Sequence, residues 1–380
     1  MRLFAATIGV ALLSSLLGPV SQASAREYAP APGAIFNYPR SGHEPSLRII
    51  NHVLQAILHT PRGATIQLAS YSYDRTDLTN ALIKAHQRGV NVQMVLNDNI
   101  VTRETKRLRG IIGANPDRRS FVLVCRFSCR GVRGNQHMKF FLFSRTGPAS
   151  NVVMVGSSNL TTFAAFNQWN DMVTFTEERA LHDLYAGMFV QLARDRLVQH
   201  QKVRRTIGNI ESTFTGQQSV TARTDLVIQR LNKVSCVAAA GTGQAGRTVI
   251  RISAYGWHGS RGVYIANKVA SLKRQGCNIR IIVSGANRDV RKILRTAEIP
   301  LRSASYDIDD EGVINMYDHL KYMTVDGTYA GKATAAVWTG SENWSDQSFR
   351  NDEVVVQVSR RSLHSRYIAN FKYMWKHDAY

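Results

Sequence analysis

His137-Met138-Lys139, followed by Gly156-Ser157-Ser158-Asn159, recurs later in the chain as His319-Leu320-Lys321, followed by Gly340-Ser341-Glu342-Asn343. The histidine precedes the asparagine by 22 residues in the first copy and by 24 in the second. Each copy supplies an imidazole, an ammonium and a carboxamide, which can attack, charge-balance and hydrogen-bond a phosphate group. The pattern predicts a pseudo-twofold enzyme with one phosphodiester site assembled from two halves.

Further matches occur in the same order on either side of these motifs. Ala69-Ser70-Tyr71 matches Ser253-Ala254-Tyr255, and residues 88–96 match residues 275–283. The offsets of all matches lie between 182 and 187 residues. A near-constant offset over so many matches indicates an internal duplication.

Each half alternates helical and strand patterns, so we expect an α/β fold of two halves, each a mixed sheet flanked by helices. In the first half, the expected helices cover residues 47–58, 78–88 and 178–196, and the expected strands cover residues 64–70, 90–96, 139–143 and 152–155. Glycines and a polar run over 213–219 interrupt the pattern between the halves. The expected organisation is an export signal over 1–25, a first half over 26–205, a linker over 206–224 and a second half over 225–380.

The first residues are typical of an export signal, which predicts a secreted protein. Arg2 precedes a mostly apolar run over 4–17, and Ala23-Ser24-Ala25 offers small residues for cleavage. The apolar run is short for a membrane span of roughly 20 residues. We therefore expect cleavage after Ala25.

The chain carries a net charge of +21 at pH 7. Such an excess attracts polyanions, either nucleic acid or an anionic membrane surface, and does not choose between them. Clusters of arginine and lysine over 103–109, 126–133 and 202–205 fit both partners.

Four cysteines in an exported chain indicate two disulfides, and four cysteines allow three pairings. The favoured pairing joins Cys125 to Cys129, just before the first motif, and Cys236 to Cys277 in the second half. A zinc site is the rival interpretation, although the Cys/His spacing fits no familiar zinc pattern.

A strand alternates its side chains with period two, so the histidine and lysine of each motif should share one face. Lys139 and Lys321 can then neutralise the phosphate, while Asn159 and Asn343 donate hydrogen bonds to it. Ser157 and Ser341 can add further donors. One imidazole can attack phosphorus while the other donates a proton to the departing oxygen. This scheme requires no metal and no cofactor.

The chain resembles the phospholipase D superfamily over nearly its whole mature length, because that family duplicates an HxKxxxxD motif followed by GSxN-type residues. The second copy is complete, with Asp326 at the aspartate position, which the resemblance implies is part of the site. Ser144 replaces this aspartate in the first copy. The family also carries an acid about ten residues after the asparagine that orients an imidazole; the candidates are Asp171 and Glu353, with Asp352 as a rival to Glu353.

The resemblance further implies that His137 is the nucleophile and His319 the general acid, although the roles could be exchanged. A phospholipid headgroup is the favoured substrate. The candidates for a lipid-accepting mouth are the aromatic residues Tyr71, Tyr73, Tyr255, Trp257, Trp169 and Trp344. A metal-independent nuclease is the main alternative, and an inactive relative that binds phosphate or anionic surfaces is a third. Hydrolysis or transfer to another alcohol remains open, and we expect a monomer.

Overall fold

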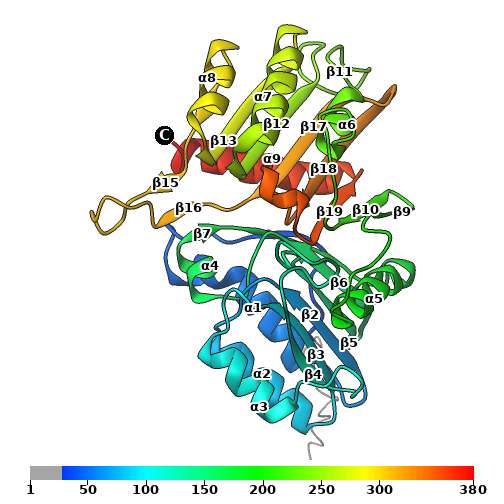
Figure 1. Cartoon of the computed structure of the whole chain (residues 1–380). Coiled ribbons are helices and arrows are strands. Elements are labelled where there is room, and N and C mark those ends of the chain that lie inside the picture. Colours follow the sequence, from blue (N-terminus) through cyan, green and yellow to red (C-terminus); the bar gives the residue numbers. More distant parts are fainter. Residues whose placement is uncertain (1–27) are drawn as a thin grey trace, which may run out of the picture.

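The computed structural model describes residues 28–380, and the expected export signal over 1–25 lies outside the described residues. Two sheets are stacked one above the other, each covered by helices (Figure 1). The α/β class expected from the sequence is confirmed.

The first sheet has seven strands in the order β1-β8-β6-β5-β2-β3-β4. The three strands at one side of the sheet, β2, β3 and β4, are parallel, and the middle strand β5 pairs antiparallel to β2. The strands are β1 (Gly33–Phe36), β2 (Thr65–Ser70), β3 (Asn91–Asn97), β4 (Phe121–Cys125), β5 (Phe140–Thr146), β6 (Ala149–Gly156) and β8 (Asp171–Phe175).

The second sheet repeats this order as β10-β19-β18-β17-β12-β13-β14, with β9 added beyond β10 and β11 paired to β17. The same relative order in both sheets shows the duplication in three dimensions. The strands are β9 (Val203–Ile207), β10 (Ile210–Thr215), β11 (Val234–Ser235), β12 (Val249–Trp257), β13 (Asn278–Ala286), β14 (Leu301–Arg302), β17 (Lys321–Tyr329), β18 (Lys332–Gly340) and β19 (Glu353–Val358).

Helices cover the outer faces of both sheets and fill the space between them. Three apolar clusters result: one under α1 and α2, one under α6, α7 and α8, and a central one that joins α5 and α9 to both sheets. The helices are α1 (His43–Leu58), α2 (Thr76–Gln87), α3 (Arg103–Ile112), α4 (Thr162–Phe166), α5 (Arg179–Ala193), α6 (Leu226–Asn232), α7 (Gly259–Arg274), α8 (Arg288–Thr296), α9 (Arg361–His377) and the 3₁₀ helix η1 (Asp346–Phe349).

The central cluster makes the two halves a single packed unit. Tyr185 of α5 contacts Phe214 of β10, and Tyr367 of α9 contacts Phe36 of β1. Burying such aromatic rings against the opposite half stabilises the docked arrangement by roughly 1.5–3 kcal/mol for each ring. Motion of one half relative to the other would expose this surface.

A third, small sheet crosses between the halves. In it β16 (Met316–Asp318) pairs antiparallel with β15 (Ser305–Tyr306) and parallel with β7 (Gln168–Trp169). The opposite crossing is a single parallel bridge between Gln136 and Asp352. Both crossings lie immediately before an HxK motif, so they fix where the motifs meet.

The expected linker over 206–224 is incorrect in its first part. Residues 203–215 form the hairpin of β9 and β10, which extends the second sheet through the pairing of β10 with β19. Gly208, at φ 57°, and Asn209 form the two-residue turn that this hairpin requires. The second half therefore begins near residue 203.

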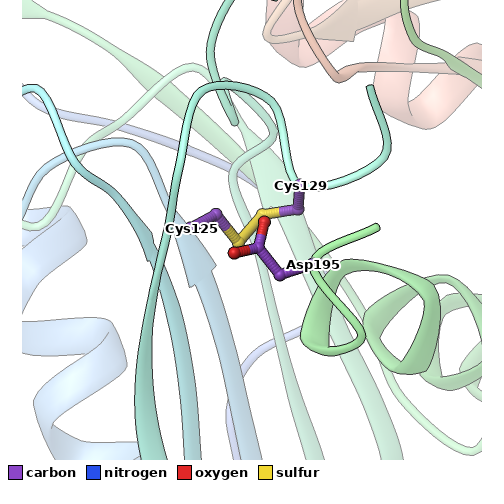
Figure 2. A group of neighbouring side chains, drawn as sticks. All are labelled: Cys125, Cys129 and Asp195. Carbon is purple, nitrogen blue, oxygen red and sulfur yellow. A yellow bond between two sulfur atoms is a disulfide. The ribbon is translucent and has the colours of Figure 1, made fainter. Parts of the chain in front are cut away.

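Both favoured disulfides are present, Cys125–Cys129 and Cys236–Cys277, and they account for all four cysteines. Figure 2 shows the first of them beside Asp195, at the end of β4. Sulfurs bonded to each other offer no thiolate to zinc, so the rival zinc interpretation is not supported. Across the described residues, no helix is both long and apolar enough to cross a membrane.

Candidate active site

The two HxK motifs meet at the boundary between the sheets. The first ends one residue before β5, and the second ends on Lys321, the first residue of β17. Each motif is fastened to the opposite half by its backbone. The amide of His137 donates to the carbonyl of Asp352 at 3.0 Å, and the amide of His319 donates to the carbonyl of Trp169 at 3.0 Å. Residues 182 positions apart in the sequence thus share one site.

The imidazoles are oriented by side chains from the opposite half. His137 Nδ1 lies 3.0 and 2.9 Å from the two carboxylate oxygens of Glu353. His319 Nδ1 lies 2.8 Å from Oδ1 of Asn170. Since both partners accept at this position, Nδ1 carries the proton and Nε2 keeps its lone pair. Over residues 28–380 neither Nε2 atom has a hydrogen-bond partner, which leaves both available to a substrate.

Asn170, and not Asp171, is the counterpart of Glu353. Gly156 pairs with Met172 across β6 and β8, and Gly340 pairs with Val355 across β18 and β19. Counting back two residues places Asn170 and Glu353 at the same register. The prediction that Asp171 orients an imidazole is therefore wrong.

Asp171 instead lies one residue further along, on the other face of the strand. Its buried carboxylate accepts hydrogen bonds from the hydroxyls of Thr339 and Tyr367. It therefore ties β8 to β18 and α9 across the central core. The rivalry between Asp352 and Glu353 is also resolved, because only Glu353 contacts an imidazole.

The two lysines occupy equivalent positions, with Lys139 fully buried and Lys321 partly buried. Lys139 Nζ and Lys321 Nζ each donate, at 2.6 Å, to the carbonyl of the histidine in their own motif. Each ammonium also lies over a tyrosine ring, Tyr71 at 5.4 Å and Tyr255 at 5.1 Å.

Burial changes the ionisation of these groups. It lowers the pKa of Lys321 to about 7, against the opposing charges of Asp318 and Glu353. It also lowers the pKa of Lys139 well below its usual value. An anion bound between the two ammonium groups would compensate for this desolvation.

Burial, reinforced by the neighbouring lysines, also lowers the pKa of both imidazoles, and that of His319 falls furthest. Only His137 has a carboxylate that opposes the shift. Burial alone would raise the pKa of Glu353, but the adjacent His137 and Lys139 hold it below its usual value. The two imidazoles therefore have equivalent hydrogen-bond geometry at Nδ1, but only His137 has a neighbouring carboxylate.

The asparagine of each GSxN segment has a side-chain oxygen that lacks a hydrogen-bond partner. Among the described residues, Oδ1 of Asn159 and Oδ1 of Asn343 are buried and have no hydrogen-bond partner. A buried carboxamide without partners is unfavourable, and a rotation about its last bond exposes donors instead. A phosphate oxygen is the acceptor that such donors fit. Gly256 permits this placement, because a Cβ there would lie 3.1 Å from Cγ of Asn343.

The serine of each GSxN segment orients the side chain that holds an imidazole. Ser157 Oγ donates to Asn170 Oδ1 at 3.0 Å, and Ser341 Oγ donates to Glu353 Oε2 at 2.5 Å. We expected these serines to donate to the phosphate directly. In the structure their hydroxyls instead donate to the residues that hold the imidazoles. The preceding glycines are required because a Cβ at Gly156 or Gly340 would lie 2.2 or 2.0 Å from a carbonyl of the adjacent strand.

Asp326 is not part of this cluster. It lies at the far end of β17 from the motif and forms an ion pair with Arg361 of α9 at 3.3 Å. The hydroxyl of Ser144, its counterpart in β5, accepts a hydrogen bond from the amide of Thr65 at 2.9 Å. Both residues therefore act within the scaffold, and the loss of the aspartate leaves the first motif's chemical groups in place.

Of the aromatic candidates for a substrate mouth, only two tyrosines reach the imidazoles. The ring of Tyr71 lies 5.4 Å from that of His137, and the ring of Tyr255 lies 5.1 Å from that of His319. Trp344 packs against the buried Trp257 instead.

Sequence reasoning missed Arg130 as well as Asn170. Arg130 is fully buried, 3.9 Å from the carboxylate of Asp352, and its amide donates to the same carboxylate. Burial raises the pKa of Asp352 to about 7, and the charge of Arg130 opposes this shift. Because Asp352 also receives the amide of His137, Arg130 and the Cys125–Cys129 loop support the nucleophile's side of the site.

Comparisons with known proteins agree with this arrangement. The family model described as "Cardiolipin synthase, PLD-like domain" matches residues 54–193 and 244–375, one match in each half. No curated protein matches the chain in sequence.

Two solved structures share the fold. Phosphatidylserine synthase from Haemophilus influenzae Rd KW20 superimposes with a TM-score of 0.59 at 10% identity, over 88% of this chain and 85% of that one. Polyphosphate kinase from Porphyromonas gingivalis gives a TM-score of 0.56 at 13% identity, over 92% of this chain. The chain spans 50% of the length of that kinase.

Proposed function

Because the chain belongs to the phospholipase D-like family of phosphodiesterases, we propose that it hydrolyses the headgroup phosphodiester of phospholipids through a phosphohistidine intermediate. The observation that carries this proposal is the pair of imidazoles, each held at Nδ1 by the opposite half and accompanied by the lysine of its own motif. We further propose that the protein acts outside the cell as a monomer.

In the first step, His137 Nε2 attacks phosphorus while His319 donates a proton to the headgroup oxygen, whose bond to phosphorus breaks. The attacking imidazole becomes positively charged, and Glu353 stabilises this charge. The carboxamide of Asn170 stabilises an imidazolium less than a carboxylate does, which makes protonated His319 the stronger proton donor. A bound phosphodiester anion favours protonation of His319 despite its lowered pKa.

In the second step, neutral His319 takes a proton from water, which attacks phosphorus and releases His137. Phosphatidic acid leaves with the added oxygen. Lys139, Lys321, Asn159 and Asn343 stabilise the charge on the non-bridging oxygens in both steps. An alcohol in place of water would give transfer instead of hydrolysis.

A lipid substrate is supported by the surface beside Tyr71. Asn99 donates to the hydroxyl of Tyr71, and the next residues, Ile100 and Val101, are exposed. Phe127 and Val132, on the loop that leads to His137, are exposed too. Exposed arginines flank these apolar side chains. Apolar tips among cations are typical of a surface that docks on anionic lipid.

The mechanism is tested by trapping the intermediate with an activated p-nitrophenyl phosphodiester. Its leaving group needs no proton, so a His319→Ala protein should form phosphohistidine at position 137 and fail to resolve it. A His137→Ala protein should form none, and each variant should lose at least ~10³-fold in turnover. Phosphohistidine at position 319 would reverse the two roles, and full turnover by His137→Ala would refute the scheme.

Nuclease activity is the second candidate, and the charge of +21 favours it. The two are separated by incubating the protein with phosphatidylcholine, cardiolipin, plasmid DNA and RNA in the presence of a chelator. Headgroup release without nucleic-acid cleavage supports the lipid proposal, and the reverse result rejects it. Cleavage of neither would identify an inactive relative.

A further inference from the structure

A cavity of about 750 Å³ adjoins the site on the side of His319. Tyr255 and Tyr317 form part of its wall, stacked on each other with ring centroids 4.7 Å apart. The same two rings lie 5.1 and 6.3 Å from the imidazole of His319. A group in this cavity would therefore contact rings that also neighbour the imidazole.

Three arginines line the cavity, and two of them are fixed by the backbone. Arg291 donates to the carbonyls of Ala286 and Ser284, and Arg302 donates to the carbonyl of Ala379. Arg295 is exposed at the rim. Fixed guanidinium groups cannot fold back onto the surface, so their orientation is set before a ligand arrives.

These arginines have no acidic partners. Within residues 28–380, no carboxylate lies within 4.0 Å of the guanidinium of Arg291, Arg295 or Arg302. Burial and the like charge of Arg295 lower the pKa of Arg291, and the charge of Tyr380 opposes this shift. Like charges held together without an ion-pair partner favour the binding of an anion. Ser284, Ser303 and Ser305 add hydroxyls to the same wall.

The first half is built differently at the equivalent place. There the hydroxyl of Tyr71 receives a hydrogen bond from Asn99, which also donates to Asn135 at 2.7 Å. The group that contacts the hydroxyl of Tyr71 is thus a neutral amide, where the second half places arginines. The cationic cavity is thus a feature of the second half, which breaks the pseudo-twofold symmetry beside His319.

The position of the cavity assigns it to one part of the substrate. On the proposed function, His319 protonates the departing oxygen, so the leaving group lies on the side of His319. We propose that the cavity is a subsite for a lipid headgroup that carries a phosphate of its own. The second phosphate would bind Arg291 and Arg295 while the first lies between the two lysines.

The same chemistry disfavours other occupants. Choline and ethanolamine headgroups are cations, which the three guanidinium groups repel. The subsite therefore predicts a preference for phosphorylated headgroups over cationic or neutral ones, beyond any general attraction to anionic vesicles.

The test compares phosphatidylinositol 4-phosphate with phosphatidylinositol, which differ only in the second phosphate. Both are presented in detergent micelles of constant surface charge, so that general electrostatic attraction is equal. We expect kcat/KM to be about tenfold higher for the phosphorylated lipid, the size of one added charge-assisted contact. Arg295→Gln should remove most of this preference and leave phosphatidylinositol cleavage unchanged. Arg274→Gln, which removes an exposed charge at the end of α7 outside the cavity, should alter neither rate.

Equal rates for the two lipids, or a preference that survives in Arg295→Gln, would overturn the subsite. If the wild-type protein cleaves neither of these lipids, and neither phosphatidylcholine nor cardiolipin, the proposed function fails, and the subsite is then tested by binding alone. Calorimetry with inositol 1,4-bisphosphate and inositol 1-phosphate should show tighter binding of the bisphosphate, lost in Arg295→Gln. Equal affinities would reject the subsite, and tighter binding of a dinucleotide that depends on Arg295 would assign it to nucleic acid instead.

Discussion

Asn170 and Glu353 occupy the same register in the two halves, and each holds the imidazole of the opposite half, one as a carboxamide and the other as a carboxylate. The duplication has therefore kept the geometry and changed the charge. This difference is the structural basis for giving the two histidines different roles.

Replacing Glu353 by Gln should make the two sides alike. Without the carboxylate, the phosphorylated His137 loses its counter-charge, and we expect kcat to fall roughly 100-fold while the fold is retained. The converse variant, Asn170→Asp, should raise the pKa of His319 and shift the pH–rate profile upward. Imidazole titration by NMR, with circular dichroism as a control for folding, checks both variants. An unchanged pKa of His319 in Asn170→Asp would contradict the assignment.

The pKa of Lys321 predicts an alkaline limit to activity. Burial lowers this pKa to about 7 in the free site, so the lysine is charged below pH 7 and neutral above it. Because the phosphodiester is held by this charge, kcat/KM should fall above pH 7, at most tenfold for each pH unit. Burial also lowers the pKa of His137, which favours the neutral form of the nucleophile.

A soluble phosphodiester assayed from pH 5 to pH 10 measures this limit without a lipid surface. Lys321→Arg should move the alkaline limb upward, even if the absolute rate decreases, because the guanidinium stays charged. A wild-type profile that is flat up to pH 9 would rule out this role for Lys321.

Asp326→Asn should change little, although the family motif includes this aspartate. The ion pair with Arg361 lies near the surface, where such pairs contribute about 0–1 kcal/mol to the free energy of unfolding. We expect activity within about threefold of wild type, as for a surface substitution. A 100-fold loss would place Asp326 in the catalytic machinery after all.

Removal of one disulfide should mainly reduce stability, and removal of the other should mainly reduce activity. Cys236–Cys277 closes a long loop, with a sequence separation of 41, and its removal should cost roughly 4 kcal/mol of unfolding free energy with little effect on a folded site. Cys125–Cys129 has a separation of 4, and its removal should cost only roughly 2 kcal/mol.

Removing Cys125–Cys129 should nevertheless reduce kcat more, because this loop holds Arg130 against Asp352. Paired serine variants, assayed for denaturant unfolding and for turnover at a temperature where both are folded, make the comparison. The reverse ranking of the two variants in turnover would contradict the role of Arg130.

The exposed apolar residues beside Tyr71 predict a difference between vesicles and soluble substrates. Phe127→Asn suits the left-handed backbone at φ 63°, and Val132→Ser keeps a small side chain. Both variants should reduce cleavage of vesicle lipid by about tenfold or more, because each fully inserted side chain contributes about 1.5–3 kcal/mol of burial. Cleavage of a soluble phosphodiester should be unchanged. Equal losses on both substrates would argue against membrane docking.

The sequence predicted the halves, the α/β class, the disulfide pairing and the meeting of His137 with His319, since these follow from repeated motifs and hydrophobic periodicity. It did not predict Asn170. The spacing from the GSxN asparagine to the residue that holds the imidazole differs by one residue between the halves, because α4 is one residue longer than η1. It also missed the β9–β10 hairpin, whose exposed polar strand resembles a linker. The cavity beside Tyr255 is lined by residues of β13, α8 and β14 that belong to no repeated motif.

The exchange of backbone and side-chain contacts between the halves also bears on when the protein can act. Neither half alone contains an imidazole together with the group that orients it, since His137 depends on residues 352–353 and His319 on residues 169–170. A chain still emerging or only partly folded therefore has no reactive centre. If the protein is exported, it needs no inhibitor to protect the lipids of the cell that makes it. The active site forms only when the last strands dock, so the unfolded chain is inactive.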